Sequence, residues 1–199
     1  MSRIACFGLL LSLVVFSSGS AQESTTASPF HGGQWAMQFG GNSDLFSLGV
    51  LHFTSAHSAW LLDVSNTTSV LNATFTDKLG ATTSSGDQQY ISLEARLGKR
   101  SYQTRRASIV SFETVGLEGG LVDQMVDFAG GNNRQTQWNA GANFELGAAY
   151  MLTSSVSVGG TASFSAGYFS YKRDDPNEAI KGHGYYSNVR VMIALGLYF

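Results

Sequence analysis

The sequence predicts an all-β fold, an eight-stranded antiparallel up-and-down transmembrane β-barrel. Three observations lead to this prediction. Only 13% of the residues are charged, whereas soluble domains have about 25%. Apolar and polar or small residues alternate over segments of about 10 to 14 residues, and this two-residue period indicates strands. Such strands are longer than the usual five or six residues, and they match the length that a tilted strand needs to cross a membrane.

Residues 1–21 have the layout of a secretory signal peptide. Arg3 precedes an apolar run at 7–16, and small residues follow it up to Ala21. The run is too short for a membrane-spanning helix, which needs about 20 apolar residues. We therefore expect 1–21 to be removed and 22–199 to form one outer-membrane β-barrel domain. That domain contains no cysteine, because Cys6 is the only one in the chain.

Eight alternating segments account for the rest of the chain, and we place them near 33–41, 45–54, 59–70, 89–98, 107–120, 137–151, 156–169 and 185–199. The sixth segment is the clearest, because aromatic or aliphatic residues occupy every second position from Trp138 to Tyr150. The eighth repeats the pattern from Val189 to Phe199. An even number of strands joined in sequence can close into a barrel, which leaves no unpaired strand edge in hydrocarbon.

In two segments the alternation does not determine which face points into the barrel. The second, LFSLGVLHF, is apolar at both alternating sets of positions. In the fifth, Glu113 and Glu118 point in opposite directions unless a β-bulge intervenes near Gly116.

The connections between the segments alternate in length. Those at 55–58 and 152–155 are tight and that at 99–106 is moderate, whereas 71–88, 121–136 and 170–184 are long and rich in Gly, Asn, Asp and Ser. Short turns in the periplasm and long loops outside are typical of outer-membrane barrels. The short connection at 42–44 breaks this pattern. Basic residues, Lys99, Arg100, Arg105 and Arg106, fall in the second turn, where we expect them to meet anionic lipid headgroups.

Aromatic residues gather near the predicted strand ends. Trp138 and Tyr150 share a face and lie about 30 Å apart along a barrel whose strands tilt by about 40°. An apolar band of about 25 Å between two aromatic girdles has a similar height. The predicted girdle consists of Trp35, Trp60, Trp138, Tyr150, Tyr168 and Tyr186, with Phe199 also near a strand end.

This combination resembles the small eight-stranded bacterial outer-membrane barrels of the OmpA and OmpX type, over essentially all of 22–199. In that class the last strand usually ends in phenylalanine after alternating apolar residues, and Leu195, Leu197 and Phe199 match this assembly signal. The resemblance implies insertion by the barrel-assembly machinery into a Gram-negative outer membrane, among lipid and lipopolysaccharide. It also implies a structural or surface-interaction role, with an extracellular partner at 71–88, 121–136 or 170–184.

The interior of an eight-stranded barrel is only wide enough to be filled by side chains. Buried charges must pair, so we expect a lumen charge network that acts as a plug. Its predicted members are Asp63, Glu94, Arg96, Glu113, Glu145 and Arg190. The sequence predicts no catalytic residue, cofactor or metal site. With 12 basic and 14 acidic residues, it also offers no basic surface for nucleic acid.

Three alternatives are kept. The first is a lipid A-modifying enzyme, because the deacylases among these barrels use a His-x-Ser-Asn motif and the chain contains HGYYSN at 183–188. The segment departs from that motif, since Tyr185 stands two residues before Ser187 and His183 stands four before it. The second is a narrow channel or hydrophobic-ligand carrier. The third is a soluble lipocalin-like barrel, because alternation alone does not say which face is inside.

Overall fold

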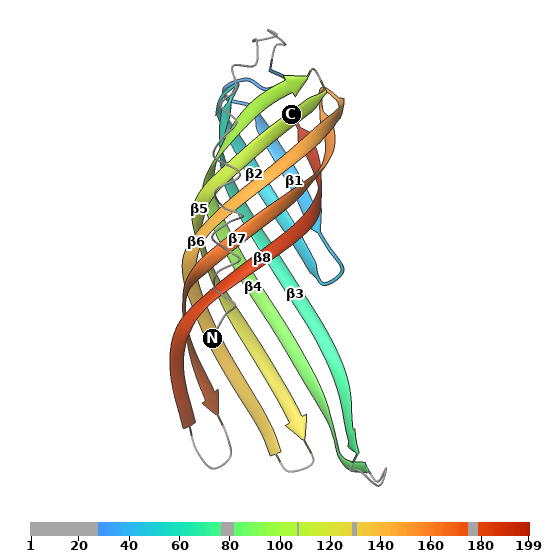
Figure 1. Ribbon diagram of the computed structural model, residues 1–199, viewed down its shortest axis with the longest axis vertical. Helices are drawn as coiled ribbons and strands as arrows, with labels where there is room; N and C mark the ends of the chain where they lie inside the picture. The colour runs from blue at the N-terminus through green and yellow to red at the C-terminus, as the bar shows by residue number, and fades with distance from the viewer. Residues whose placement is uncertain (1–27, 77–81, 107, 129–130, 175–178) are drawn as a thin grey trace, which may run out of the picture.

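The structure is a computed structural model, which describes residues 28–76, 82–106, 108–128, 131–174 and 179–199. The predicted signal peptide at 1–21 lies outside the described residues. The described chain forms one closed, antiparallel barrel in which each strand pairs with the next and β8 pairs with β1 (Figure 1). The strands are β1 (Trp35–Gly41), β2 (Leu45–Ser55), β3 (Ser58–Thr76), β4 (Thr82–Arg106), β5 (Ile109–Phe128), β6 (Gly131–Thr153), β7 (Val156–Asp174) and β8 (Ala179–Tyr198). The predicted fold class is therefore confirmed.

The strand register determines the tilt of the strands and the width of the barrel. The ring of paired residues that starts at Ala36 on β1 reaches Asn188 on β8, whereas Ala36 itself pairs with Tyr198. The sheet thus closes with a stagger of ten residues. For eight strands this stagger corresponds to a tilt of about 40°, so each residue advances about 2.5 Å along the barrel axis.

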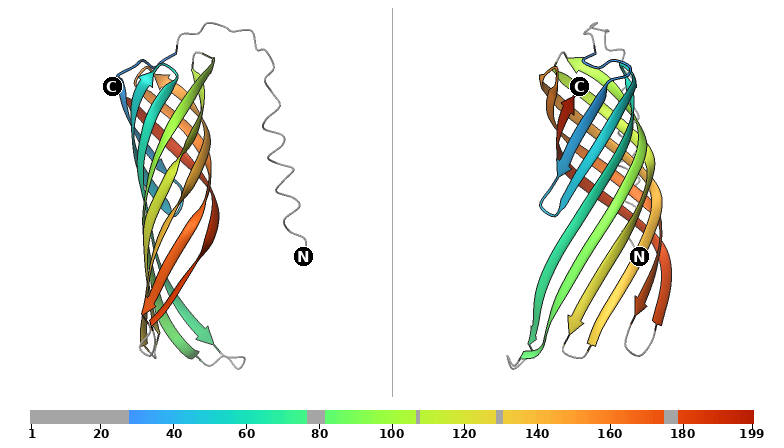
Figure 2. Two further views of the ribbon diagram at one scale, coloured as in Figure 1. Left: turned by 90° about the vertical axis from the view of Figure 1, so that its left-hand side faces the viewer. Right: turned by 180° about the vertical axis from the view of Figure 1, so that it is seen from behind.

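Six of the strands are much longer than predicted. The expected loops at 71–88, 121–136 and 170–184 are largely strand, because the segments 71–76 with 82–88, 121–128 with 131–136, and 170–174 with 179–184 pair with each other. Antiparallel pairing satisfies the hydrogen-bonding groups of the backbone regardless of the side chains. These polar segments therefore continue the hairpins. The β1–β2 hairpin stops well short of the end that β3 to β8 reach (Figures 1 and 2).

The two faces of the wall differ in polarity. Along β4, Ser92, Arg96 and Arg100 are buried inside, whereas Leu93 and Leu97 are about half exposed outside. Large apolar side chains cover the exterior of every strand, from Phe46 on β2 to Ile193 on β8. A soluble barrel has the opposite arrangement, with an apolar interior, so the soluble lipocalin-like alternative does not fit. The described residues contain no helix long and apolar enough to cross a membrane.

Aromatic residues form two belts on the exterior. Near the short turns lie Trp35, Trp60, Tyr150 and Phe199, and toward the other end lie Trp138, Tyr168 and Tyr185. The ring of Tyr168 is 5.7 Å from that of Trp138 and 6.0 Å from that of Tyr185. The prediction that Tyr186 belongs to the girdle is wrong. Tyr186 points into the lumen, and its neighbour Tyr185 takes the outward position at 87% exposure.

Candidate functional site: a filled lumen

The lumen is closed by aromatic side chains at the end where the short turns and Phe199 lie. Phe30, which precedes β1, is only 4% exposed. Its ring lies 4.6 Å from Phe53, 4.8 Å from Tyr102 and 5.1 Å from Tyr198. The last three residues come from β2, β4 and β8, so one ring from the N-terminal segment joins three parts of the wall.

Hydrogen bonds fix the segment that carries Phe30. The Ser28 hydroxyl donates to the carbonyl oxygen of Ala56 at 2.7 Å, and the Phe30 amide donates to the Ser28 hydroxyl at 3.3 Å. The His31 amide donates to the buried side chain of Gln34 at 3.3 Å. The segment before β1 is thus folded across the mouth of the barrel. The sequence does not predict this plug, because SPFHGG has no periodicity that would mark Phe30 as buried.

Arg100 is the centre of a polar layer that lies next to the aromatic plug, on the side away from the short turns. Its side chain is 1% exposed and donates to Glu145 at 2.5 Å, to Gln38 at 2.6 Å and to Thr114 at 2.9 Å. The guanidinium carbon also lies 4.1 Å from the centre of the Phe112 ring. One cation therefore ties together β1, β4, β5 and β6.

Arg96, four residues before Arg100 on β4, extends this layer. It donates to one oxygen of Asp63 through Nη2 at 2.6 Å and through Nε at 3.1 Å. Its Nη1 atom lies 3.7 Å from Glu145. Arg96, Arg100, Asp63 and Glu145 are each at most 5% exposed. Two cations and two carboxylates balance in charge, which is the condition for burying them together.

A second polar layer lies further from the short turns. Arg190 forms an ion pair with Glu94 at 2.5 Å, and both side chains are slightly accessible. Glu118 accepts hydrogen bonds from Ser165 at 2.7 Å and from Tyr186 at 2.8 Å. This layer joins β4, β5, β7 and β8. The two layers and the plug together fill the part of the lumen that is nearer the short turns.

The structure places five of the predicted lumen charges inside the barrel, namely Asp63, Glu94, Arg96, Glu145 and Arg190. Glu113 is a wrong prediction. It lies on the outer face, because β5 has no bulge near Gly116 and its even-numbered residues face the lumen. The inward carboxylate of β5 is instead Glu118.

The prediction that Arg100 meets lipid headgroups from the second turn is also wrong, because its side chain is buried in the lumen. It shares the even-numbered, inward face of Arg96, so the alternation would have identified it if the fourth segment had been extended by two residues.

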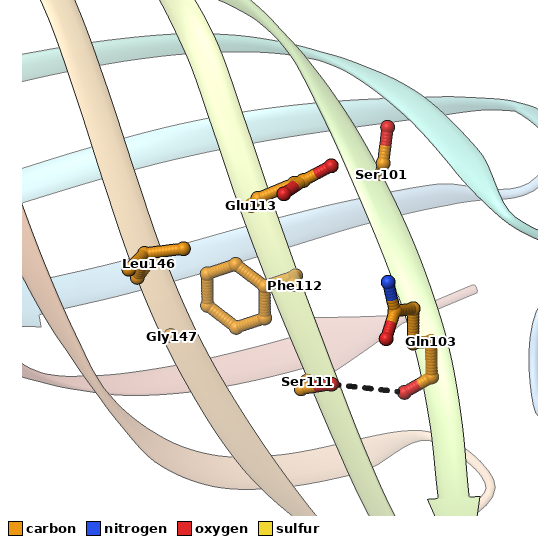
Figure 3. Close-up of a pocket in the computed structure, with 7 residues that line it drawn as sticks. All are labelled: Ser101, Gln103, Ser111, Phe112, Glu113, Leu146 and Gly147. Atoms are coloured by element: carbon orange, nitrogen blue, oxygen red, sulfur yellow. Dashed lines mark hydrogen bonds between the residues drawn. The ribbon is translucent and has the colours of Figure 1, made fainter. Parts of the chain in front are cut away.

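Glu113 lines a shallow pocket of about 180 Å³ on the outer wall (Figure 3). Ser101 and Gln103 on β4, and Ser111 on β5, lie beside it, and the Ser111 hydroxyl donates to the Gln103 carbonyl oxygen at 3.4 Å. This pocket contains one carboxylate and no histidine, lysine or arginine among its lining residues. It therefore lacks the pair of acid and base groups that a hydrolytic site needs.

The residues of the HGYYSN segment do not form a catalytic pair. His183 stacks against Tyr168 at 5.9 Å on the exterior. Ser187 is four residues away on the same strand, which corresponds to about 13 Å. A base must lie within hydrogen-bond reach of its nucleophile. Among the described residues, no group of three or more His, Cys, Asp or Glu side chains could hold a metal ion.

Known structures with a similar fold come from bacterial outer membranes. The outer membrane protein OprG from Pseudomonas aeruginosa superimposes with a TM-score of 0.57 at 14% identity, covering 86% of this chain and 98% of that one. A major outer membrane protein from Thermus thermophilus gives a TM-score of 0.51 at 12% identity, covering 83% of this chain and 98% of that one.

No protein-family model matches the sequence, and no curated protein matches it significantly. At such low identities the similarity concerns the fold. The chain has the eight-stranded, OmpA- and OmpX-like fold of the small outer-membrane β-barrels.

Proposed function

We propose that the protein is embedded in a bacterial outer membrane as a closed barrel, with a structural or surface-interaction role carried by the part that rises above the membrane. The exterior supports the membrane location. Trp138 and Tyr150 are twelve residues apart on β6, or about 30 Å along the axis at the observed tilt. The outward side chains between them include Phe144 and Leu146. Belts at this spacing fit an apolar band of about 25 Å.

The filled lumen is the observation that carries the proposed role. A pore needs a continuous path for water or solute, but the interior here is crossed by the Phe30 cluster, by the Arg100 layer and by the Glu94–Arg190 layer. Each layer joins strands from several parts of the wall, so the side chains act as internal braces. A barrel braced in this way is a rigid base for the strands and connections that project from its outer rim.

The outer rim is built from the extensions of β3 to β8 beyond the belt of Trp138, Tyr168 and Tyr185. Exposed ion pairs lie on its outer face, between Arg134 and Asp123 at 2.7 Å and between Lys172 and Asp174 at 2.8 Å. Most of the outward side chains that the structure describes on its strands are polar, although Met125 is also exposed. This projecting sheet and the connections 77–81, 129–130 and 175–178 are where we expect an extracellular partner to bind. The surrounding lipopolysaccharide would contact the same region.

Insertion by the barrel-assembly machinery is part of the same proposal. Phe199 is 70% exposed, while its backbone exchanges hydrogen bonds with Trp35. Its ring is therefore free to be recognised although its backbone completes the β1–β8 seam. Leu195 and Leu197 face outward beside it, as a recognition strip requires.

An epitope inserted at different connections tests the location and orientation. In one variant the epitope lies within 77–81, between β3 and β4, and in the matched control it lies between Ser154 and Ser155, in the short turn between β6 and β7. Intact cells should bind antibody only when the epitope is at 77–81. The control should bind it only after the outer membrane is permeabilised. The reverse pattern, or labelling of both in intact cells, would contradict the proposal.

A further inference from the structure

A block of polar side chains interrupts the apolar exterior of β4 and β5 near the short turns. Ser101 pairs with Glu113 across the two strands. Gln103 pairs in the same way with Ser111, so the four side chains lie side by side on the outer face. They line the outer-wall pocket of about 180 Å³, with Leu146 of β6 at one side (Figure 3). This is the volume of about six water molecules, so the pocket has room for a small polar group of several atoms.

The pocket lies at the height of the aromatic belt near the short turns. Trp60, a member of that belt, pairs with Lys99 on β4, and Ser101 pairs with Glu113 on β5. Following these pairs at the tilt of the strands places Glu113 within about 2 Å of the height of Trp60. Val115, two residues further from the short turns on β5, is apolar and exposed. The polar block therefore ends where the apolar band begins.

Two opposite charges at this boundary are not joined to each other. Lys99 and Glu113 are diagonal neighbours on β4 and β5, a position in which residues are about 7–8 Å apart. Both side chains are exposed. Among the residues whose side chains the structure describes, neither of the two has an ion-pair partner. A carboxylate at the edge of the hydrocarbon is costly unless a cationic or hydrogen-bonding group meets it.

The side of the membrane narrows the choice of a group that could meet it. The projecting sheet lies where lipopolysaccharide is expected, whereas the pocket lies at the opposite end of the barrel, in the periplasmic leaflet, which consists of phospholipid. A phosphatidylethanolamine headgroup combines a phosphate with a compact ammonium group that has three N–H donors. Phosphatidylglycerol has no cation for Glu113, and the trimethylammonium group of phosphatidylcholine has no N–H to donate.

We propose that the pocket binds the headgroup of a phosphatidylethanolamine molecule from the periplasmic leaflet. The ammonium group donates hydrogen bonds to the Glu113 carboxylate and the Ser101 hydroxyl, and Lys99 meets the phosphate. Lys99 lies about 2 Å further from the short turns than Glu113. The phosphate and ammonium groups follow the same order in a lipid whose chains point into the membrane. The inference rests on the proposed membrane location and orientation.

Quenching of single tryptophans by brominated lipids tests the pocket. The chain has three tryptophans, and a variant of 22–199 with Trp35→Phe and Trp138→Phe retains only Trp60, the neighbour of Lys99 on β3. The matched control, with Trp35→Phe and Trp60→Phe, retains only Trp138 in the other belt. Both proteins are refolded into phosphatidylcholine vesicles. These contain the same small fraction of either phosphatidylethanolamine or phosphatidylcholine that is brominated in its acyl chains.

Brominated phosphatidylethanolamine should quench Trp60 more strongly than brominated phosphatidylcholine does. We expect its enrichment beside Trp60 to be about two- to fivefold, the range for a partly exposed ion pair. The two lipids should quench Trp138 equally. Adding Glu113→Gln should abolish the preference at Trp60. Asp44→Asn, which removes an exposed carboxylate in the turn at 42–44, should leave the preference unchanged.

Equal quenching of Trp60 by the two lipids would overturn the proposed headgroup site. A preference that survives Glu113→Gln, or that also appears at Trp138, would overturn it too, because the pocket would then not be its cause. If neither lipid quenched either tryptophan, the membrane location itself would be contradicted, and the headgroup site with it. The failure of the site alone is thus distinguishable from the failure of the proposed function.

Discussion

Replacing Arg100 by methionine should destabilise the barrel more than any other single change of a lumen charge. The substitution keeps most of the side-chain volume and removes the cation. Glu145 would lose its 2.5 Å partner and retain Arg96 at 3.7 Å and the Thr114 hydroxyl at 3.3 Å. Gln38 would lose its donor at 2.6 Å. Removing one partner of a buried ion pair costs about 3–5 kcal/mol, so we expect a loss of about 4 kcal/mol in the free energy of unfolding.

The assay is urea unfolding in detergent micelles, combined with a double-mutant cycle. Arg100→Met together with Glu145→Leu should cost less than the sum of the two single changes. Arg190→Met should couple in the same way to a change of Glu94, its partner at 2.5 Å, but not to a change of Glu145. Arg134→Met is the control, because its pair with Asp123 is exposed and should contribute at most about 1 kcal/mol. Strict additivity for Arg100 with Glu145 would refute the account of the lumen.

Three further predictions concern the wall, the plug and the seam. Phe144 lies midway between Trp138 and Tyr150 on the outer face, so Phe144→Arg should cost about 2–4 kcal/mol of stability in vesicles, and an unchanged stability would argue that this face does not meet lipid. Phe30→Ala should cost about 3 kcal/mol because it leaves a cavity among buried rings; urea unfolding measures the loss, and a cost below about 1 kcal/mol would show that the plug is not packed. Deleting Phe199 should lower the amount of protein in the outer membrane of cells while refolding in detergent stays nearly intact, and equal membrane levels of both forms would count against recognition of the C-terminal residue.

The alternation in the sequence was sufficient to predict eight strands and most inward faces. Side chains at even positions of β4 and odd positions of β6 face the lumen, so Arg96 and Glu145 could be identified from the amino-acid pattern alone. The same rule also applies to the closing strand. Its apolar strip places odd-numbered residues of β8 outside, which makes Tyr185 a belt residue and Tyr186 a lumen residue.

Other features could not be obtained from alternation. Basic residues around Arg100 resemble a turn, and polar strands beyond the membrane carry no apolar period, so the strand ends were placed too early. The choice between Glu113 and Glu118 depends on whether a bulge interrupts β5, which is a property of the backbone pairing. The position of Phe30 depends on a contact between the N-terminal segment and three strands, and a single aromatic residue gives no local signal for such a contact.

Conductance across a planar lipid bilayer tests most directly the central claim that the lumen is closed by its own side chains. Refolded protein of residues 22–199 would be added to one side of the bilayer, and its insertion would be verified. The current would be recorded at a range of voltages before and after insertion. We expect no discrete conductance steps, either for the parent protein or for Phe30→Ala, because the Arg100 and Arg190 layers still fill the barrel without the plug. Stable and reproducible steps from the parent protein would contradict the closed lumen and favour a channel.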